Sequence, residues 1–223
     1  DIILVYAKTD KGAGAKGISA FVVPTDTPGF SVAQKLTKMG FRGSQTGEIV
    51  FDNCRVPAEN MLRGENQGVQ VVMSGLDLER AVVTPICLGV CERALELAID
   101  YAKTREQFGQ PIGNFQMVQA KLADMYVWVE TLRTFNNRVL AMCNQVGHGE
   151  AGRGEIHMLT AASVKYAGET MNKVLNEAMQ IHGGSGYIWE TEINRLYRSI
   201  KLLEIGAGTT EVRNLIIAGE LLK

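Results

Sequence analysis

The fold is decided by residues 77–104, which read DLERAVVTPICLGVCERALELAIDYAKT. Apolar residues recur in this stretch at spacings of three and four, which places them on one face of an α-helix. They are Val83, Ile86, Val90, Ala94, Leu97 and Tyr101. Pro85 lies inside the pattern, where it either kinks the helix or marks its first turns. The stretch therefore predicts one long helix that starts near residue 77 and buries a single face.

Helical patterns continue from this stretch to the end of the chain. Further helices are predicted over residues 115–146, 155–181 and 191–203, and a last one from residue 209 onward. Glycine-containing loops at 109–113, 147–149 and 183–186 separate them. Three long helices and two shorter ones, joined by short loops, predict an antiparallel up-and-down bundle.

The beginning of the chain has a different pattern, typical of β-structure. Short runs rich in Val, Ile and Phe, at 2–6, 18–23, 30–36 and 48–51, alternate with clusters of Gly, Pro, Asp and Thr. The predicted fold class is α+β, mainly α. We expect a partial antiparallel β domain over residues 1–64, followed by a helical bundle domain over residues 65–223.

Composition excludes several classes of function. The formal net charge is −1, which gives no electrostatic case for binding nucleic acid or an anionic membrane. No apolar run approaches the ~20 residues that span a bilayer. The four cysteines and the three histidines, His148, His157 and His182, lack metal-site spacing, so no metal is predicted. The chain begins at Asp1 without an initiator Met, so we expect a piece of a longer polypeptide.

Glu79 is the first candidate catalytic residue. Its neighbours Leu78 and Ala81 are apolar, so burial is expected. Burial raises the pKa of a carboxyl group towards neutral pH, where the group can act as a base. The alternative is a solvated glutamate, or one paired with Arg80 or Arg93.

Two later segments contain residue types that can hold an anionic, planar ligand. In REQFG, at 105–109, Arg105 can bind a phosphate and Phe108 can pack on a flat ring. Alternatively, Arg105 only complements the helix C-terminus and Phe108 staples the loop. The segment QIHGGSGY, at 180–187, is a glycine-rich helix exit that lets a ligand approach the backbone, or an ordinary glycine cap.

The last loop reads IGAGTTE at 205–211 and opens the final helix. Thr209 or Thr210 can cap that helix, with Glu211 in its first turn. The exposed backbone N–H groups of a helix start suit an anionic or carbonyl oxygen. Simple capping is the alternative.

Taken in order along the chain, these segments resemble the acyl-CoA dehydrogenase family. The resemblance covers essentially all 223 residues and rests on KMGFRGS at 38–44, LDLER at 76–80, REQFG at 105–109, FQ at 115–116, QIHGGSG at 180–186, RSIK at 198–201 and GAGTTEVR at 206–213. The isovaleryl branch of the family is most similar, through SGLDLER at 74–80, ADMY at 123–126 and EIGAGT at 204–209. The chain looks like the second half of the middle β domain plus the C-terminal helical domain.

The resemblance implies an enzyme that uses FAD to dehydrogenate a short branched-chain acyl-CoA thioester to the 2-enoyl-CoA. Most relatives carry the catalytic Glu in the last loop, where this chain has Ala207, but the isovaleryl and long-chain branches carry it at the position of Glu79. Glu79 is therefore expected to take the α-proton. Ala207 is expected to donate its backbone N–H to the thioester oxygen, beside Gly206 in the substrate site. Asp77 and Arg80 match positions that touch the pantetheine arm or order the site.

The same resemblance implies the cofactor site and the partners. The matching flavin-binding positions are Arg105, Phe108, Gln116, Gln180, Gly183, Gly184, Thr209 and Glu211. Several of these reach the flavin of a neighbouring subunit, which implies a homo-oligomer, a dimer of dimers. Electron-transferring flavoprotein is the implied electron acceptor, in the bacterial cytoplasm or the mitochondrial matrix.

Two departures from the family pattern leave alternatives open. Gln107 stands where many relatives carry a small hydroxyl residue, and Leu203 stands where isovaleryl enzymes commonly carry Tyr. A changed pocket wall alters a preference for one or two methylenes by only ~1–3 kcal/mol, so other acyl chains remain possible. An acyl-CoA oxidase is a further alternative, although oxidases usually carry their Glu in the last loop. The last alternative is an inactive, oligomerising fragment without FAD.

Overall fold

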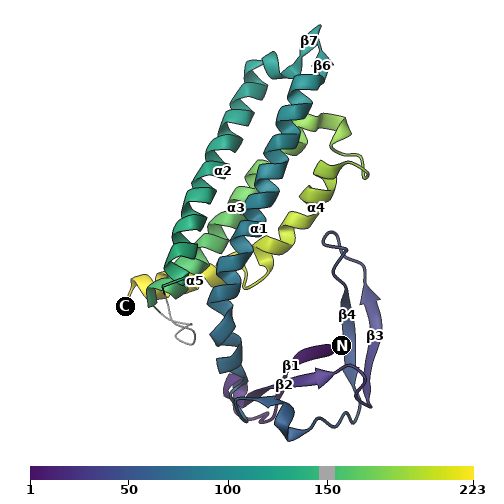
Figure 1. Cartoon of the computed structure of the whole chain (residues 1–223), viewed down its shortest axis with the longest axis vertical. Coiled ribbons are helices and arrows are strands. Elements are labelled where there is room, and N and C mark those ends of the chain that lie inside the picture. Colours follow the sequence, from purple (N-terminus) through teal and green to yellow (C-terminus); the bar gives the residue numbers. More distant parts are fainter. Residues whose placement is uncertain (146–153) are drawn as a thin grey trace. The chain divides into compact units, whose positions relative to one another are not determined.

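The computed structural model describes residues 1–145 and 154–223, in two compact units (Figure 1). The first unit covers Asp1–Leu76 and the second covers Asp77–Lys223. The long helix α1 (Gly68–Thr104) begins in the first unit and continues through the second. The expected domain boundary after residue 64 stays a prediction.

The first unit consists of short antiparallel strands. β1 (Ile2–Lys8) pairs with β2 (Ile18–Pro24), and β2 pairs in turn with the two-residue strand β5 (Met61–Leu62). β3 (Phe30–Leu36) and β4 (Thr46–Phe51) form a separate hairpin. The short 3₁₀ helices η1 (Gly14–Gly17) and η2 (Ala58–Asn60) precede β2 and β5. The four predicted strands are present, and β5 is an addition that the sequence pattern did not reveal.

The start of α1 packs tightly against β2. A Cβ atom at Gly68 would lie 2.8 Å from the carbonyl oxygen of Ile18, so a larger residue would push the two segments apart. Ser19 accepts a hydrogen bond from the backbone N–H of Asn66 at 2.7 Å and also contacts the hydroxyl of Thr9 at 2.7 Å. These contacts fix the chain where it passes from β-structure into the helix.

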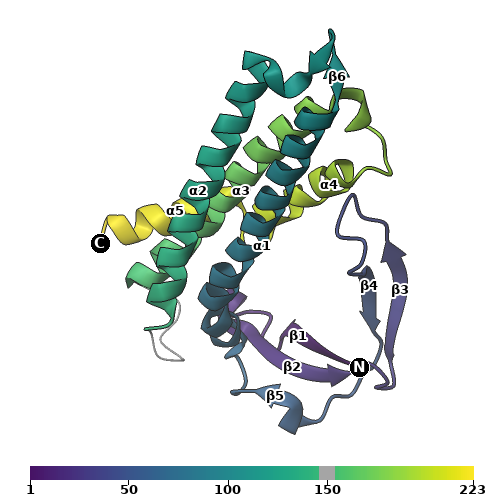
Figure 2. The ribbon, with the colours of Figure 1, turned by 45° about the horizontal axis from the view of Figure 1, so that its top comes forward.

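The second unit is an antiparallel bundle (Figures 1 and 2). α1, α2 (Gln116–Cys143), α3 (Gly154–His182) and α4 (Glu192–Ile205) run alternately up and down, and α3 contacts α2, α4 and the last helix, α5 (Thr210–Leu221). The small hairpin β6 (Glu106–Gln107) and β7 (Gln110–Pro111), followed by η3 (Ile112–Asn114), joins α1 to α2. η4 (Gly183–Ser185) ends α3. The predicted bundle is confirmed; the predicted end of the second helix at 146 and the loop at 147–149 lie outside the described residues.

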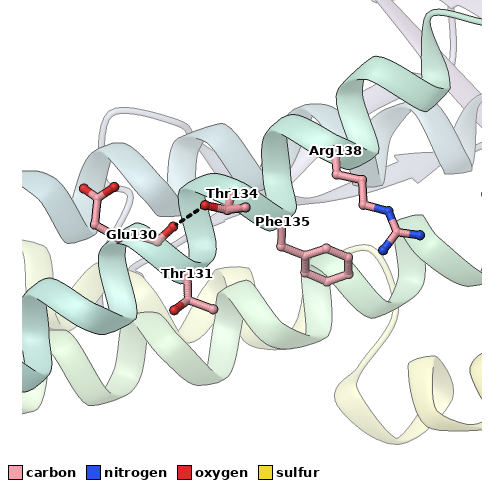
Figure 3. Close-up of a pocket in the computed structure, with 5 residues that line it drawn as sticks. All are labelled: Glu130, Thr131, Thr134, Phe135 and Arg138. Atoms are coloured by element: carbon pink, nitrogen blue, oxygen red, sulfur yellow. Dashed lines mark hydrogen bonds between the residues drawn. The ribbon is translucent and has the colours of Figure 1, made fainter.

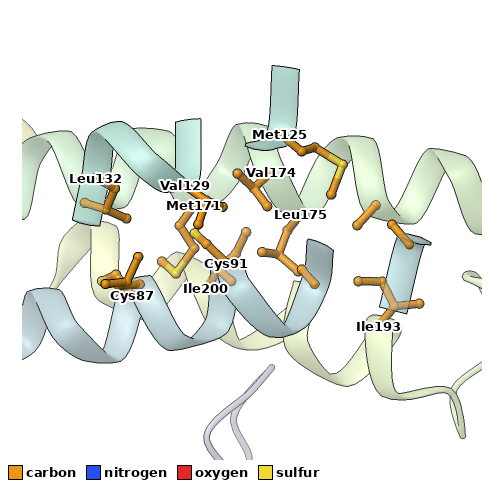
Figure 4. Close-up of a cluster of buried hydrophobic side chains, with 14 of the residues drawn as sticks. Cys87, Cys91, Met125, Val129, Leu132, Met171, Val174, Leu175, Ile193 and Ile200 are labelled. Carbon is orange, nitrogen blue, oxygen red and sulfur yellow. The ribbon is translucent and has the colours of Figure 1, made fainter. Parts of the chain in front are cut away.

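The core of the bundle is built from small residues on α1 and larger ones on its neighbours (Figure 4). Cys87, Cys91, Ala94 and Ala98 of α1 are fully buried, and they pack among apolar side chains such as Met171 of α3. Small residues at successive turns of α1 let the neighbouring helices approach it closely.

The predicted apolar stripe on α1 is partly wrong. Ile86 is 50% exposed, whereas Cys87 beside it is buried. Val83, Val90, Leu97 and Tyr101 lie at the edge of the core, each partly buried. The inward face is therefore rotated by about one residue from the predicted one, about 100° of helix turn at that position. The predicted start near residue 77 is also wrong, because the helix begins at Gly68, and Pro85 therefore lies well inside it.

Candidate functional site

Glu79 lies on α1, two residues into the second unit, and its side chain is exposed. The expectation that it is buried is wrong for this chain. Its apolar neighbours Leu78 and Val82 are themselves 54% and 51% exposed, so they lie on the outer side of the helix rather than in the core. The alternative ion pair with Arg93 is not formed either, because Arg93 pairs with carboxylates further along the chain.

The residues on either side of Glu79 point inward. Asp77 and Arg80 are each only 2% exposed, and Arg80 Nη1 lies 3.4 Å from Asp77 Oδ1. Arg80 Nε lies 3.4 Å from the carbonyl oxygen of Ala207 in the last loop. Burial lowers the pKa of Arg80, and the charges of Asp77 and Glu79 oppose that shift. The turn that carries Glu79 is thus bonded, through Arg80, to the loop that contains Ala207.

A second buried arginine holds the other side of this loop. Arg213 of α5 is fully buried and donates to the carbonyl oxygens of Glu204 at 2.9 Å, Leu203 at 3.4 Å and Gly206. Burial lowers the pKa of Arg213, and the nearby positive charge of Arg80 lowers it further. Sequence reasoning gave Arg213 no role, although it ends the GAGTTEVR motif.

The loop itself has an unusual backbone. Ala207 has a φ of 55° and Gly208 a φ of 94°, both in the left-handed region. A non-glycine residue in that region costs about 1–3 kcal/mol and persists when its surroundings fix it. The buried arginines on both sides provide such surroundings. The strained residue is the one whose N–H is expected to meet the thioester oxygen.

The start of α5 follows directly. The side chain of Thr209 accepts a long hydrogen bond from the N–H of Val212 at 3.5 Å, which confirms it as the N-cap. The pKa of Glu211 is lowered, first by a hydrogen bond from its own backbone N–H and then by one from the side chain of Thr209. Thr210 has a buried hydroxyl without a partner among the described residues.

The other predicted cofactor residues lie at the opposite end of the bundle, near the β6–β7 hairpin and the end of α3 (Figure 1). They are Arg105, Phe108, Gln116, Gln180, Gly183 and Gly184, all exposed. Tyr101 joins the two segments, because its ring stacks on His182 with centroids 4.5 Å apart and its hydroxyl bonds to Ser185 at 3.1 Å. The fold therefore gathers six of the eight predicted positions at one end.

These two groups are far apart. Glu79 and Thr104 are separated by 25 helical steps, which span roughly 38 Å at the ordinary helix rise. Thr209 and Glu211 lie at the Glu79 end of the bundle, whereas Arg105 follows the far end of α1. Both groups can contact the same cofactor within one chain only if that molecule spans the bundle.

The exposed end fits a group that approaches from outside the chain. A Cβ atom at Gly184 would meet nothing within 4 Å, and its φ is not positive, so nothing in the described part of the chain requires glycine there. Gly186 differs, because a Cβ there would lie 2.8 Å from the sulfur of Met179. Phe108 is 92% exposed with a φ of 53°, and its ring forms a T-shaped pair with that of Phe115. Accessible glycine backbone and an exposed aromatic ring are compatible with a planar cofactor such as a flavin.

A surface hollow of about 470 Å³ lies elsewhere, on the outer side of α2 (Figure 3). Glu130, Thr131, Thr134, Phe135 and Arg138 line it. None of the residues predicted from sequence is among them, and its lining comes from a single helix. It therefore gives no support to a site separate from the one described.

Two features are absent from residues 1–145 and 154–223. Within these ranges no group of three His, Cys, Asp or Glu side chains is placed to hold a metal ion. No helix there combines the length and the apolarity that crossing a bilayer requires.

Comparisons with known proteins agree with the order of these elements. Residues 66–222 match the model of the acyl-CoA dehydrogenase C-terminal domain, and residues 1–54 match that of the acyl-CoA dehydrogenase middle domain. The mitochondrial isovaleryl-CoA dehydrogenase of Oryza sativa subsp. japonica is 48% identical over 99% of this chain and 52% of its own length. The mitochondrial 2-methylacyl-CoA dehydrogenase of Solanum tuberosum is 46% identical over the same shares.

A solved structure supports the same relationship. Butyryl-CoA dehydrogenase from Megasphaera elsdenii is 38% identical and superposes with a TM-score of 0.91, covering 100% of this chain and 56% of that one. The chain thus spans about half the length of the relatives it matches.

Proposed function

Because the chain belongs to the acyl-CoA dehydrogenase family, we propose that it forms part of a flavin-dependent enzyme that dehydrogenates a short branched-chain acyl-CoA thioester to the 2-enoyl-CoA. The observation that carries this proposal is the contact between Arg80 and Ala207. It brings the helix turn that carries Glu79 next to the loop that is expected to bind the thioester. Relatives named for isovaleryl-CoA and 2-methylacyl-CoA favour a branched acyl chain.

In this proposal Glu79 removes the proton from the carbon next to the thioester carbonyl. That proton is weakly acidic, so the reaction depends on stabilising negative charge on the thioester oxygen. The N–H of Ala207 donates to that oxygen, and the buried guanidinium groups of Arg80 and Arg213 hold the loop in place. FAD, when bound, supplies the ring that accepts the β-hydrogen as hydride.

Glu79 is exposed in this chain, so its action as a base requires that something else shield it from water. A general base works best when water is kept away from it. Leu78, Val82 and Ile86 give the same side of α1 an exposed apolar surface. An acyl thioester bound over that surface would cover Glu79 and exclude water at the moment of reaction.

The two groups of cofactor residues support an oligomeric enzyme. We propose that the six residues at the hairpin end hold the flavin of a neighbouring subunit, while Thr209 and Glu211 contact the flavin of their own. This arrangement makes each site depend on two chains, within the expected dimer of dimers. We also propose that the enzyme passes its electrons to electron-transferring flavoprotein. Its proposed location is the mitochondrial matrix or the bacterial cytoplasm.

The preferred acyl chain depends on Leu203. This residue is only partly buried and packs at the edge of the core beside the last loop. Leucine at this position leaves more room than the tyrosine of isovaleryl enzymes, so we expect some tolerance for longer chains. Steady-state rates with isovaleryl-, butyryl- and octanoyl-CoA measure the preference directly.

The test uses the full-length enzyme and Glu79→Gln. We expect turnover to fall by about 10²–10⁴-fold, the usual contribution of a general base, while flavin absorbance stays at the wild-type level. Glu96→Gln is the matched control, because Glu96 is an exposed glutamate on the same helix whose only described partner is Arg93. Near-normal turnover of the Glu79→Gln enzyme would exclude Glu79 as the base.

A further inference from the structure

His157 takes part in a buried polar cluster that no sequence motif indicates. It lies in the first turns of α3, and its side chain is 12% exposed. Its Nδ1 lies 2.7 Å from Asp77 Oδ1, a distance typical of a charge-assisted hydrogen bond. Because a carboxylate only accepts, the proton of this bond belongs to the Nδ1 of the imidazole.

The same carboxylate oxygen serves as the centre of the cluster. Arg80 Nη1 approaches it at 3.4 Å and the hydroxyl of Thr160 at 3.5 Å. Both distances are long for hydrogen bonds, whereas the 2.7 Å contact from His157 is short. His157 is therefore well placed to hold the carboxylate, and Arg80 lies beside both groups, 3.4 Å from Asp77 Oδ1 and 3.5 Å from Nδ1 of His157.

Arg80 transmits this position to the last loop. The guanidinium group contacts Asp77 with one nitrogen and the carbonyl oxygen of Ala207 with another, each at 3.4 Å. A guanidinium group is planar and rigid, so a shift at one nitrogen moves the other. A continuous path thus runs from His157 through Asp77 and Arg80 to Ala207, the residue with a φ of 55°.

The charges around His157 come from three helices. α1 contributes Asp77 and Arg80, and α5 contributes Glu220, whose lowered pKa owes most to Lys223 and a smaller part to His157. Cys143 of α2 is close enough to Asp77 for that charge to raise the pKa of its thiol, after the larger effect of burial. Of these groups, Arg80 also donates to Asp77 Oδ1, but at a longer distance than His157.

We propose that His157 is a positioning residue: by holding Asp77, it fixes Arg80 and so the backbone of the Ala207 loop in its left-handed conformation. The proposal rests on the proposed function only for the consequence in catalysis. His157 itself touches neither substrate nor cofactor in this account.

The test compares His157→Ala with His157→Asn in the full-length protein. The alanine variant removes the donor, whereas the amide of asparagine can still donate to Asp77 from near the position of Nδ1. Hydrogen exchange is followed at the amides of Gly206 and Val212, which bond to Leu202 O and Thr209 Oγ1. We expect His157→Ala to accelerate this exchange about tenfold, as the loss of one charge-assisted bond would, and His157→Asn to restore most of the protection.

Amides in the middle of the bundle, at Leu132 and Val174, serve as the internal reference because both residues are fully buried there. Unchanged exchange at 206 and 212 in His157→Ala would overturn the proposal. So would an equal acceleration at Leu132 and Val174, since that would mean general destabilisation, and so would the absence of rescue by asparagine.

A kinetic readout separates this inference from the proposed function. In the active enzyme we expect His157→Ala to lower kcat about tenfold with little change in KM, and His157→Asn to recover it. The exchange experiment needs neither substrate nor turnover. If Glu79→Gln leaves turnover intact, the proposed function fails while the exchange result still decides whether His157 positions the loop.

Discussion

Arg80 and Ala207 are 127 residues apart in the sequence, yet Arg80 Nε lies 3.4 Å from the carbonyl oxygen of Ala207. This contact joins the first helix of the bundle to the loop before the last one. A buried guanidinium group needs a counter-charge and acceptors, and Asp77 and the loop backbone supply them. The loop is thereby held by the helix turn that carries Glu79.

Removal of the counter-charge should destabilise the protein strongly. Asp77→Ala leaves Arg80 buried without its carboxylate, a change that typically costs about 3–5 kcal/mol in the free energy of unfolding. Asp100→Ala is the control, since Asp100 is an exposed aspartate on the same helix. Urea denaturation of both variants measures the difference, and a loss at Asp77 no larger than that at Asp100 would contradict the role of the pair.

Arg213→Lys should weaken the other side of the loop. A lysine keeps the charge but cannot reach three carbonyl oxygens with a planar fork, so at least one buried acceptor stays unpaired at a cost of about 1–3 kcal/mol. Arg195→Lys is the matched control, because Arg195 is exposed and bonded to Glu192. Thermal unfolding measures the melting temperatures of both variants. Equal melting temperatures would contradict a stabilising role for the contacts of Arg213 with the three carbonyl oxygens.

Alkaline pH should destabilise the bundle through its buried thiols. Burial raises the pKa of Cys87 to about 11 from 9.0, and burial also raises that of Cys91. Because the folded-state pKa lies above the unfolded one, the stabilisation is complete below pH 9 and is lost as the pH rises towards 11. For Cys87 alone a shift of this size corresponds to about 2–3 kcal/mol.

The measurement is the free energy of unfolding at pH 8 and pH 10.5, in the wild type and in Cys87→Ala/Cys91→Ala under reducing conditions. The double variant is expected to be less stable at pH 8 but to lose less stability on going to pH 10.5. If the free energy of unfolding fell by the same amount in both proteins, these thiols would not be the groups responsible for the loss of stability at alkaline pH.

Sharing of the flavin site between subunits can be tested by complementation. Phe108 is 92% exposed, so Phe108→Ala should change folding stability by no more than about 0.5 kcal/mol while lowering flavin affinity. Met117→Ala is the control at the same end of the bundle, since Met117 is 80% exposed.

In mixed oligomers, a site that takes Glu79 from a Phe108→Ala chain and Phe108 from a Glu79→Gln chain is intact. The reverse combination lacks both residues, and the two combinations occur equally often. At a flavin concentration that leaves the Phe108→Ala enzyme empty, random mixing should restore about a quarter of the wild-type activity. If each site belonged to a single chain, the mixture would be no more active than the average of its two components.

The sequence predicted the bundle well because helix periodicity is a local signal. The ends of α3 and α4 fall within one or two residues of their predicted positions. The face of α1 was harder, since both Ile86 and Cys87 are apolar in type and only packing decides which of them points inward. The strand β5 escaped prediction because two residues are too few to show alternation.

The site was predicted less completely for a similar reason. Apolar neighbours suggested that Glu79 is buried, but Leu78 and Val82 lie on the exposed side of the helix with it. His157 meets Asp77 across 80 residues of sequence, and no short motif encodes such a pair. Arg213 stood inside a recognised motif, yet its contacts with three carbonyl oxygens depend on the turn that α4 and α5 make together.

The central claim is that Glu79 is the base, placed beside the Ala207 loop. The most direct measurement is the exchange of the α-hydrogen of isovaleryl-CoA with solvent deuterium, followed by proton NMR in the full-length enzyme. This step needs the base but no hydride transfer. We expect Glu79→Gln to slow the exchange by about 10²–10⁴-fold relative to the wild type and to Glu96→Gln. Exchange at the wild-type rate in Glu79→Gln would contradict the account.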